Sequence, residues 1–184
     1  MPSSATFPRP SALARAPGPE SPVRRNLSLA LADLDAAEQR GEAVHLAQAL
    51  AKVADCYHAA GMASHRRWYL LQALRFAALL GAVDTRVDLL CQLAEADAED
   101  TRSESSDSPN DSRRTHNARD HVRDHVFQAA QLASRCADAQ WEVTVLLRLG
   151  AILDTLGDHD DAAALQRRAL ALIADAAPTR ELAG

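Results

Sequence analysis

Residues 141–174, WEVTVLLRLGAILDTLGDHDDAAALQRRALALIA, decide the fold, because apolar spacing, a turn signal and a helix cap coincide there. In the first half, large apolar residues recur at three- and four-residue steps, which places them on one face of a helix. Gly157 follows the last of them and suits the left-handed conformation that ends a helix. Asp158 and Asp160 can then cap a second helix. The stretch predicts two antiparallel helices that need neighbours to bury their remaining apolar surface.

Composition limits the class of protein. The chain has 184 residues, of which 47% are apolar and 24% charged, enough for one domain. Aromatic residues are only 4% and alanine is abundant, so we expect an all-α fold. The formal net charge of −5 argues against direct nucleic-acid binding. No apolar run approaches the ~20 residues of a membrane span, so no membrane association is expected.

The two ends of the chain are predicted to form tails, and its cysteines indicate the redox compartment. Residues 1–20 are rich in proline, serine and alanine, which predicts a disordered tail, and 177–184 are expected to form a second tail. Cys56, Cys91 and Cys136 are widely spaced within apolar helical patterns, so they are interpreted as small buried hydrophobic side chains in a reducing, cytoplasmic compartment. Lysine occurs once among 20 basic residues, an arginine bias typical of a GC-rich bacterial source.

The segment between the tails, residues 21–176, is predicted to form one domain of about seven helices. Ser21, Ser64 and Asp84 are interpreted as N-caps, and glycines follow several helices. Residues 99–117, EDTRSESSDSPNDSRRTHN, contain no large apolar residue and have a proline at their middle. They are predicted to form a disordered insertion between the two helices of the middle pair.

An internal repeat relates the first and last helix pairs at a constant offset of 96 residues. Without the insertion, the remaining separation corresponds to roughly 38 residues per helix pair, within the range of helical repeats. The matching positions are Leu50 and Leu146, Val53 and Leu149, Tyr57 and Leu153, Gly61 and Gly157, Ala73 and Ala169, and Leu74 and Leu170.

These residues resemble the tetratricopeptide repeat, whose motif has Leu-Gly in the first helix, glycine at the turn and small residues in the second helix. The last pair matches at Leu149, Gly150, Leu153, Gly157, Ala162 and Ala169. The first pair matches at Val53, Ala54, Tyr57, Gly61 and Ala73, with Arg66 where a small residue is expected, and the middle pair at Leu90, Cys91 and Ala94. The resemblance covers residues 42–175. It implies a right-handed superhelical stack of antiparallel helix hairpins with a concave groove for a peptide or partner helix, and no catalysis.

The register of that resemblance implies a set of groove positions on the first helix of each pair. Four of them are acidic, which predicts a groove that prefers a cationic or mixed-charge segment; the alternative is a merely solvated helical face. The positions are Gln48, Ala51, Lys52, Asp55 and His58 in the first pair, Thr85, Asp88, Gln92 and Glu95 in the second, and Thr144, Leu147, Arg148, Ala151 and Asp154 in the third.

Other candidate chemistry is weaker. His121 and His125 have the spacing of two metal-binding imidazoles, but Val122 stands where a zinc protease has its glutamate, so a solvated helix turn is preferred and no metal is predicted. Arginines cluster between residues 113 and 123, and this basic run either binds an acidic partner or phosphate, or pairs with nearby carboxylates. Its members are Arg113, Arg114, Arg119 and Arg123.

The sequence therefore favours a cytoplasmic protein-interaction module, an adaptor or scaffold whose groove binds another protein or peptide. It contains no glycine-rich phosphate loop and no recognisable nucleophile pair, so neither enzyme activity nor a cofactor is expected. Apolar ends of the stack leave a homodimer open. The chain is also similar in composition to the helical sensor halves of bacterial transcriptional activators. The alternative is therefore a regulatory or sensory module that acts through self-association or a partner.

Overall fold

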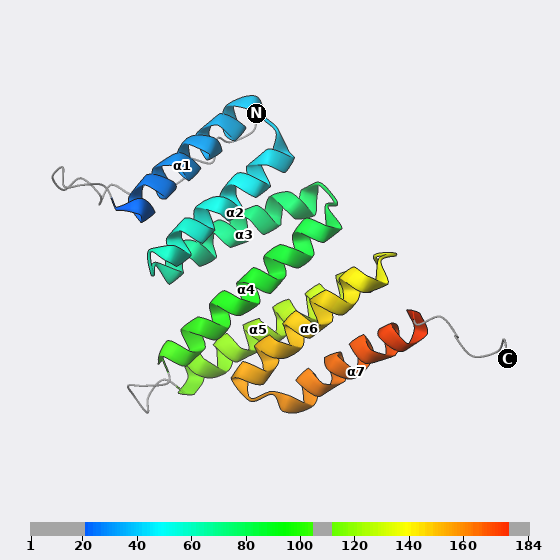
Figure 1. Cartoon of the computed structure of the whole chain (residues 1–184). Helices are drawn as coiled ribbons and strands as arrows, with labels where there is room; N and C mark the ends of the chain where they lie inside the picture. Colours follow the sequence, from blue (N-terminus) through cyan, green and yellow to red (C-terminus); the bar gives the residue numbers. More distant parts are fainter. Residues whose placement is uncertain (1–20, 105–111, 177–184) are drawn as a thin grey trace.

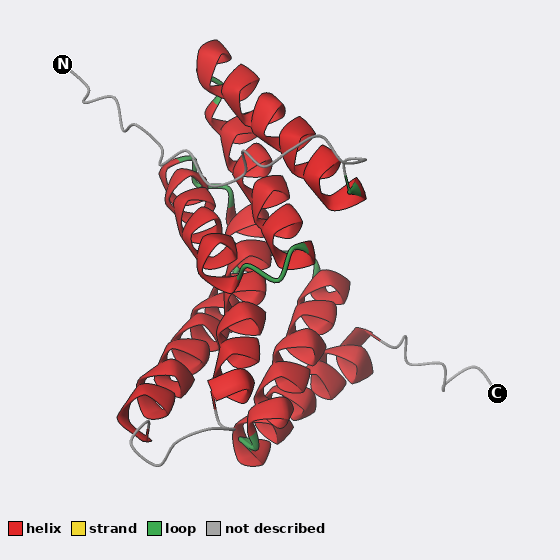
Figure 2. Ribbon diagram, turned by 90° about the vertical axis from the view of Figure 1, so that its left-hand side faces the viewer, coloured by secondary structure: helices red, strands yellow, loops and turns green. Residues whose placement is uncertain are grey.

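The computed structural model describes residues 21–104 and 112–176, which form seven α-helices and no strand (Figure 1). The prediction of an all-α fold is confirmed, and short loops join most of the helices (Figure 2). Both predicted tails lie outside the described residues. None of the described helices is long and apolar enough to span a membrane. The helices are α1 (Pro22–Arg40), α2 (Ala43–Ala59), α3 (Ala63–Leu79), α4 (Val83–Glu104), α5 (Ser112–Ala133), α6 (Ala139–Leu156) and α7 (His159–Ala176).

The helices form a stack in which each packs against the next, with α1 and α7 at opposite ends (Figure 1). The most extensive contacts lie within three antiparallel pairs, α2 with α3, α4 with α5, and α6 with α7. These are the three helix pairs expected from the sequence, and α1 adds a leading helix against α2. A further contact joins α4 to α6, two helices that are not consecutive. This contact brings the first helices of two neighbouring pairs side by side.

The turn between α6 and α7 has the predicted glycine geometry. Gly157 has φ of 82°, in the left-handed region, and its N–H donates to the carbonyl oxygens of Leu153 and Asp154. A second glycine, Gly150, lies inside α6, where a Cβ would be 3.4 Å from Cγ of Gln166 and 3.5 Å from the carbonyl oxygen of Ala162. A Cβ at this position would therefore lie in ordinary van der Waals contact with α7.

The predicted helix caps are right in some places and wrong in others. Asp138 accepts a hydrogen bond from the N–H of Trp141 at 3.0 Å, and Ser21 accepts one from Arg24. The caps predicted at Ser64 and Asp84 are wrong, because α3 begins at Ala63 and α4 at Val83. Both predicted caps therefore lie within a first helical turn. The chain enters each of these helices from a turn around a glycine with positive φ, and Met62, which precedes α3, makes no side-chain cap hydrogen bond.

The prediction of a disordered insertion over residues 99–117 is wrong at both of its ends. Helix α4 continues to Glu104 and α5 begins at Ser112, so the predicted loop is helical at both ends, and residues 105–111 lie outside the described part. The physical reason is that small and polar residues continue the buried face of α4. Ala98 and Thr101 are 2% exposed, and the Thr101 hydroxyl donates to the carbonyl oxygen of Asp97 at 2.8 Å. Counting apolar residues along the sequence does not detect a buried helix face made of small and polar residues.

Two core clusters hold the stack together, and α4 contributes to both. One cluster joins α1, α2 and α3 to the α4 residues Leu89, Leu93 and Ala96. The other joins α5, α6 and α7 to a different face of α4, which includes Leu90 and Ala94. Because side chains three and four apart share a helix face, α4 carries two apolar stripes, one for each half of the stack.

Candidate functional site

Three alternate acidic residues of α4 form ion pairs with side chains of neighbouring helices. The guanidinium of Arg148 on α6 donates to Oε1 of Glu95 at 2.7 Å, and that of Arg66 on α3 donates to Oε2 of Glu99 at 2.6 Å. Asp97, between them in sequence, is 3% exposed. Residues two apart lie on nearly opposite sides of a helix, whereas residues four apart share a side. Glu95 and Glu99 therefore share the side of α4 that faces the α4–α6 contact.

The buried carboxylate of Asp97 lies close to charged side chains of α3 and α5. Its Oδ1 lies 3.0 Å from Nε of Arg67 on α3, and its Oδ2 lies 3.4 Å from Nδ1 of His125 on α5. His125 is one of the two histidines with metal-like spacing, and His121 is exposed. Within the described ranges, no three His, Cys, Asp or Glu side chains are grouped to hold a metal ion. His125 thus contributes to the packing of α5 on α4.

A cavity of about 220 Å³ opens between the C-terminal halves of α4 and α6. We call it the α4–α6 groove. Its apolar surface is provided by alanine and isoleucine side chains, and its edges carry two acidic and two basic residues. The lining residues are Glu95, Ala98, Glu99 and Arg102 from α4, and Arg148, Ala151, Ile152 and Thr155 from α6. The groove combines a small apolar floor with charges of both signs.

Arg148 connects the two helices of the groove electrostatically. Besides Glu95, it approaches Oδ1 of Asp88 at 3.8 Å. The hydrogen bond to Glu95 raises the pKa of Arg148, and burial opposes that shift. Burial raises the pKa of Asp88, while Arg148 opposes the rise. The arginine therefore stays charged and partly neutralises two of the four acidic positions expected in the groove.

The predicted groove positions are divided among several surroundings. Asp88, Glu95 and Arg148 come together, and Ala151 also lines the groove. His58 reaches the edge of this region, where its Nδ1 lies 3.0 Å from the Arg66 guanidinium.

The other predicted positions lie elsewhere. Lys52 faces α1, with its Nζ 3.8 Å from Asp33. Asp154 faces α7, where His159 and Gln166 contact it at 3.1 and 3.2 Å. Gln48, Asp55, Thr144 and Leu147 are exposed, and Ala51, Thr85 and Gln92 are half-buried, all outside the lining of the groove.

Two residues of the groove, Glu99 and Arg102, were missed because they fall within the predicted insertion. Their spacing from Glu95, four residues and then three, was the signal that could have found them, since it continues one helix face. In the sequence, Arg66 is only a departure from the repeat pattern, a charged residue where a small one is expected. The structure explains that departure, because Arg66 is 7% exposed and bridges His58 on α2 to Glu99 on α4.

The basic run lies in the first half of α5, and its described anchoring contacts are made by Arg123. Arg123 forms a two-pronged ion pair with Asp158, at 2.9 Å from Nε and 2.7 Å from a terminal nitrogen. Its pairing with a nearby carboxylate follows the second of the two interpretations of the run. Arg119 is exposed. The side chains of Arg113 and Arg114 lie outside the described residues.

The cysteines differ in burial. Cys91 is fully buried, and burial raises the pKa of its thiol to about 12. Cys56 and Cys136 are only half-buried, so the expectation of three buried cysteines is right for one of them. The Cys91 thiol stays protonated at neutral pH and is a packing group between α4 and its neighbours.

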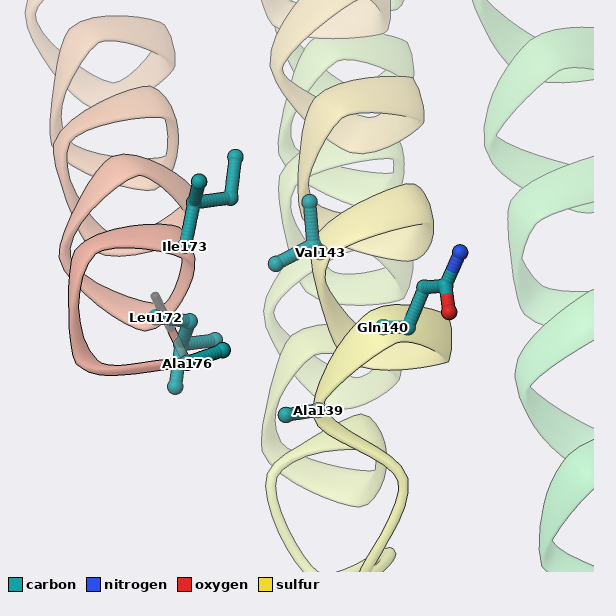
Figure 3. Close-up of a pocket in the computed structure, with 6 residues that line it drawn as sticks. All are labelled: Ala139, Gln140, Val143, Leu172, Ile173 and Ala176. Carbon is teal, nitrogen blue, oxygen red and sulfur yellow. The ribbon is translucent and has the colours of Figure 1, made fainter. Parts of the chain in front are cut away.

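A second, apolar cavity of about 350 Å³ lies between the start of α6 and the end of α7. Figure 3 shows the side chains of Val143 and Ile173 projecting into the space between the two helices. The other lining residues are Ala139, Gln140, Leu172 and Ala176. No ionisable side chain lines this cavity, so it offers apolar contact and no polar chemistry beyond the Gln140 amide.

Comparison with known proteins leaves the groove and the stack as the main basis for a functional proposal. No protein family matches the chain, and no curated protein matches it. Among solved structures, BtubC (BKLC) from P. vanneervenii aligns over 90% of this chain and 96% of its own, with 14% sequence identity and a TM-score of 0.31. At that TM-score the likeness carries no argument. The fold and the groove define the class as an all-α helical stack with a mixed-charge groove.

Proposed function

We propose that this protein is a cytoplasmic interaction module of the tetratricopeptide type, an adaptor or scaffold that binds a peptide or partner helix in the α4–α6 groove. The observation that carries the proposal is the side-by-side placement of α4 and α6 with an open cavity between them. In the repeat register these are the first helices of two neighbouring pairs. That register assigns first helices to the concave surface.

The size of the groove favours a side chain of a larger partner over a free cofactor. Its volume of about 220 Å³ is below the roughly 300–1,000 Å³ of typical small-molecule sites. Ala98, Ala151 and Ile152 supply an apolar floor for one or two partner side chains. Such small pockets within a larger surface are typical of helix or peptide recognition, where a few anchors provide most of the affinity.

The charges at the edges of the groove favour a mixed-charge ligand. Glu95 and Asp88 share Arg148, and Glu99 is paired with Arg66, so the acidic excess expected from the sequence is largely neutralised. Arg102 lines the groove at the end of α4, where it can receive an acidic group. A ligand with an apolar anchor flanked by one cation and one anion would complement this arrangement.

Filling the groove provides the direct test. We would immobilise the wild type, Ala151→Arg and the matched control Ala32→Arg, which alters an exposed alanine of α1 at the other end of the stack. Proteins retained from a lysate of the source cell would be quantified by mass spectrometry. We expect at least one partner that the wild type and Ala32→Arg retain and that Ala151→Arg loses by about tenfold or more.

Defined peptides then test the ligand chemistry. Basic, acidic and mixed-charge peptides, each with a central leucine, would be titrated at low and high salt. We expect the mixed-charge peptide to bind most tightly, with an affinity that decreases at high salt. Equal retention of every partner by all three proteins, together with equal binding of the three peptides, would exclude the α4–α6 groove as the interaction site.

A further inference from the structure

The apolar cavity between the start of α6 and the end of α7, which we call the α6–α7 pocket, is large enough for a ligand but has little polar chemistry (Figure 3). Its volume of about 350 Å³ lies in the range of small-molecule sites, yet only the Gln140 amide is available to orient a ligand. Val143 is half-buried and Ile173 is 49% exposed, so branched apolar side chains remain in contact with water. Such a surface favours an apolar side chain of a protein segment as its occupant.

The internal repeat shows that the first helix pair is closed at the place of this pocket. At the offset of 96 residues, Val143 corresponds to Ala47 on α2 and Ile173 to Ala77 on α3. Ala47 is 2% exposed and Ala77 is fully buried. The rim of the pocket, nearer the helix ends, corresponds to exposed residues of the first pair, Val44 and Leu80. The last pair therefore leaves open, at its centre, a contact that the first pair closes.

The chain beyond the second helix takes different paths in the two pairs. After α3, the N–H of Ala82 donates to the carbonyl oxygen of Ala77 at 3.2 Å, and α4 then packs against α3. Residues 177–184, APTRELAG, follow α7 at the equivalent place. Pro178 is the counterpart of Ala82, and because proline has no N–H it cannot form the same hydrogen bond. The segment after α7 is therefore not directed along the path that α4 follows.

Residues 177–184 have the reach, the apolar side chain and the charge to fill the pocket. Ala176, the last residue of α7, itself lines the pocket. Leu182 is the one large aliphatic residue of the segment and lies six residues further on, a stretch that spans at most about 20 Å. Asp138 and Asp175 are exposed, and each directly precedes a lining residue, one on each helix. They offer two carboxylates to Arg180 at the edge of the pocket.

We propose that residues 177–184 fold back over the end of the last helix pair and place the Leu182 side chain in the α6–α7 pocket, against Val143 and Ile173. Removing these apolar groups from water stabilises the arrangement, and Arg180 lies beside the carboxylates at the edge. The pocket shares helix α6 with the α4–α6 groove but no lining residue. The chain therefore covers this cavity with its own residues and leaves the groove open to a partner.

Methyl nuclear magnetic resonance of the full chain tests the position of Leu182 directly. Nuclear Overhauser effects join methyl groups only at short range, and we expect one between Leu182 and the δ-methyl group of Ile173. A mixture of isotope-labelled and unlabelled chains distinguishes docking within one chain from docking on a second copy, because only the second gives an effect between the two kinds of chain. The absence of the effect, or its presence only between chains, would overturn the proposal.

A double-mutant cycle tests whether this contact stabilises the fold. Leu182→Asp should lower the thermal midpoint by roughly 2–4 °C, because the buried leucine is lost. The matched control, Leu29→Asp on α1, alters a leucine that is 62% exposed and should leave the midpoint almost unchanged. Ala139→Arg places a long side chain in the pocket, so adding Leu182→Asp to it should have little further effect. Adding Leu182→Asp to Ala32→Arg, at the other end of the stack, should still lower the midpoint. Equal losses in both backgrounds, or no loss in the wild type, would contradict docking of Leu182 in this pocket.

Discussion

We expect Gly150→Ala to make the protein more stable by about 0.5–1 kcal/mol, although the repeat pattern has glycine at this position. Gly150 lies in the interior of α6 with ordinary helical backbone, where glycine loses more conformational freedom on folding than alanine does. The new Cβ would lie 3.4 Å from Cγ of Gln166 and 3.5 Å from the carbonyl oxygen of Ala162. These are the shortest of ordinary van der Waals contacts, and the Gln166 side chain is flexible, so the methyl group fits.

The same substitution at Gly157 should have the opposite sign. No atom lies within 4 Å of a Cβ built there, so crowding does not contribute. However, φ is 82°, a conformation that costs an alanine about 1–2 kcal/mol. We expect Gly157→Ala to be less stable than the wild type by about 1 kcal/mol. The two variants together separate the effect of space from the effect of backbone conformation.

Urea unfolding followed by far-UV circular dichroism measures both changes. The midpoint should rise for Gly150→Ala and fall for Gly157→Ala, with the same denaturant dependence as the wild type. In thermal unfolding, about 1 kcal/mol corresponds to a shift of roughly 2–4 °C for a chain of this size. If Gly150→Ala is less stable by more than about 1 kcal/mol, α6 and α7 cannot accept even one methyl group at this contact. The reasoning from the Cβ distances would then be refuted.

Two further predictions concern buried groups of α4. The thiol pKa of Cys91 is about 12 in the folded chain and 9.0 without burial, so the unfolded state loses its proton at lower pH. Stability should therefore fall as pH rises from 9 towards 12. Cys91→Ala should reduce this fall, measured as the change of the thermal midpoint with pH. If Cys91→Ala keeps the full alkaline slope, the buried thiol is not its cause. Asp97→Ala leaves Arg67 and His125 without their shared carboxylate and should cost about 3 kcal/mol in urea unfolding. The exposed-site control, Asp35→Ala, should cost less than about 0.5 kcal/mol, and equal losses would contradict the role of Asp97.

The helices and several of their ends could be predicted because the responsible forces are local. Gly157 ends α6 through backbone conformation alone, and Ser21 and Asp138 cap their helices through a side chain three residues from its partner. Such signals depend on near neighbours in the chain. The end of α4 could not be predicted in the same way, because Thr101 is buried by packing against other helices and not by its own hydrophobicity.

The groove was only partly predictable for a related reason. Repeat register placed Glu95 and Arg148 on facing helices, and the structure joins them at 2.7 Å. Repeat register cannot show which charges neutralise one another, because that depends on pairs that are distant in the sequence. Arg148 and Glu95 are 53 residues apart, and Arg66 and Glu99 are 33 residues apart. Arg66 illustrates the difficulty: a charged residue at a position expected to be small is an exception to the pattern, yet it holds three helices together.

The use of α4 by both core clusters has a consequence for how the protein opens. Neither half of the stack can complete its core without α4, so unfolding of α4 removes apolar contacts from α1–α3 and from α5–α7 together. Repeat proteins commonly fray from their ends, with each unit supported only by its neighbours. Here we expect amide hydrogens in both halves to exchange at similar rates once α4 opens. A ligand that holds α4 in place would then slow exchange at the distant α1–α2 contact as well as beside its own binding site.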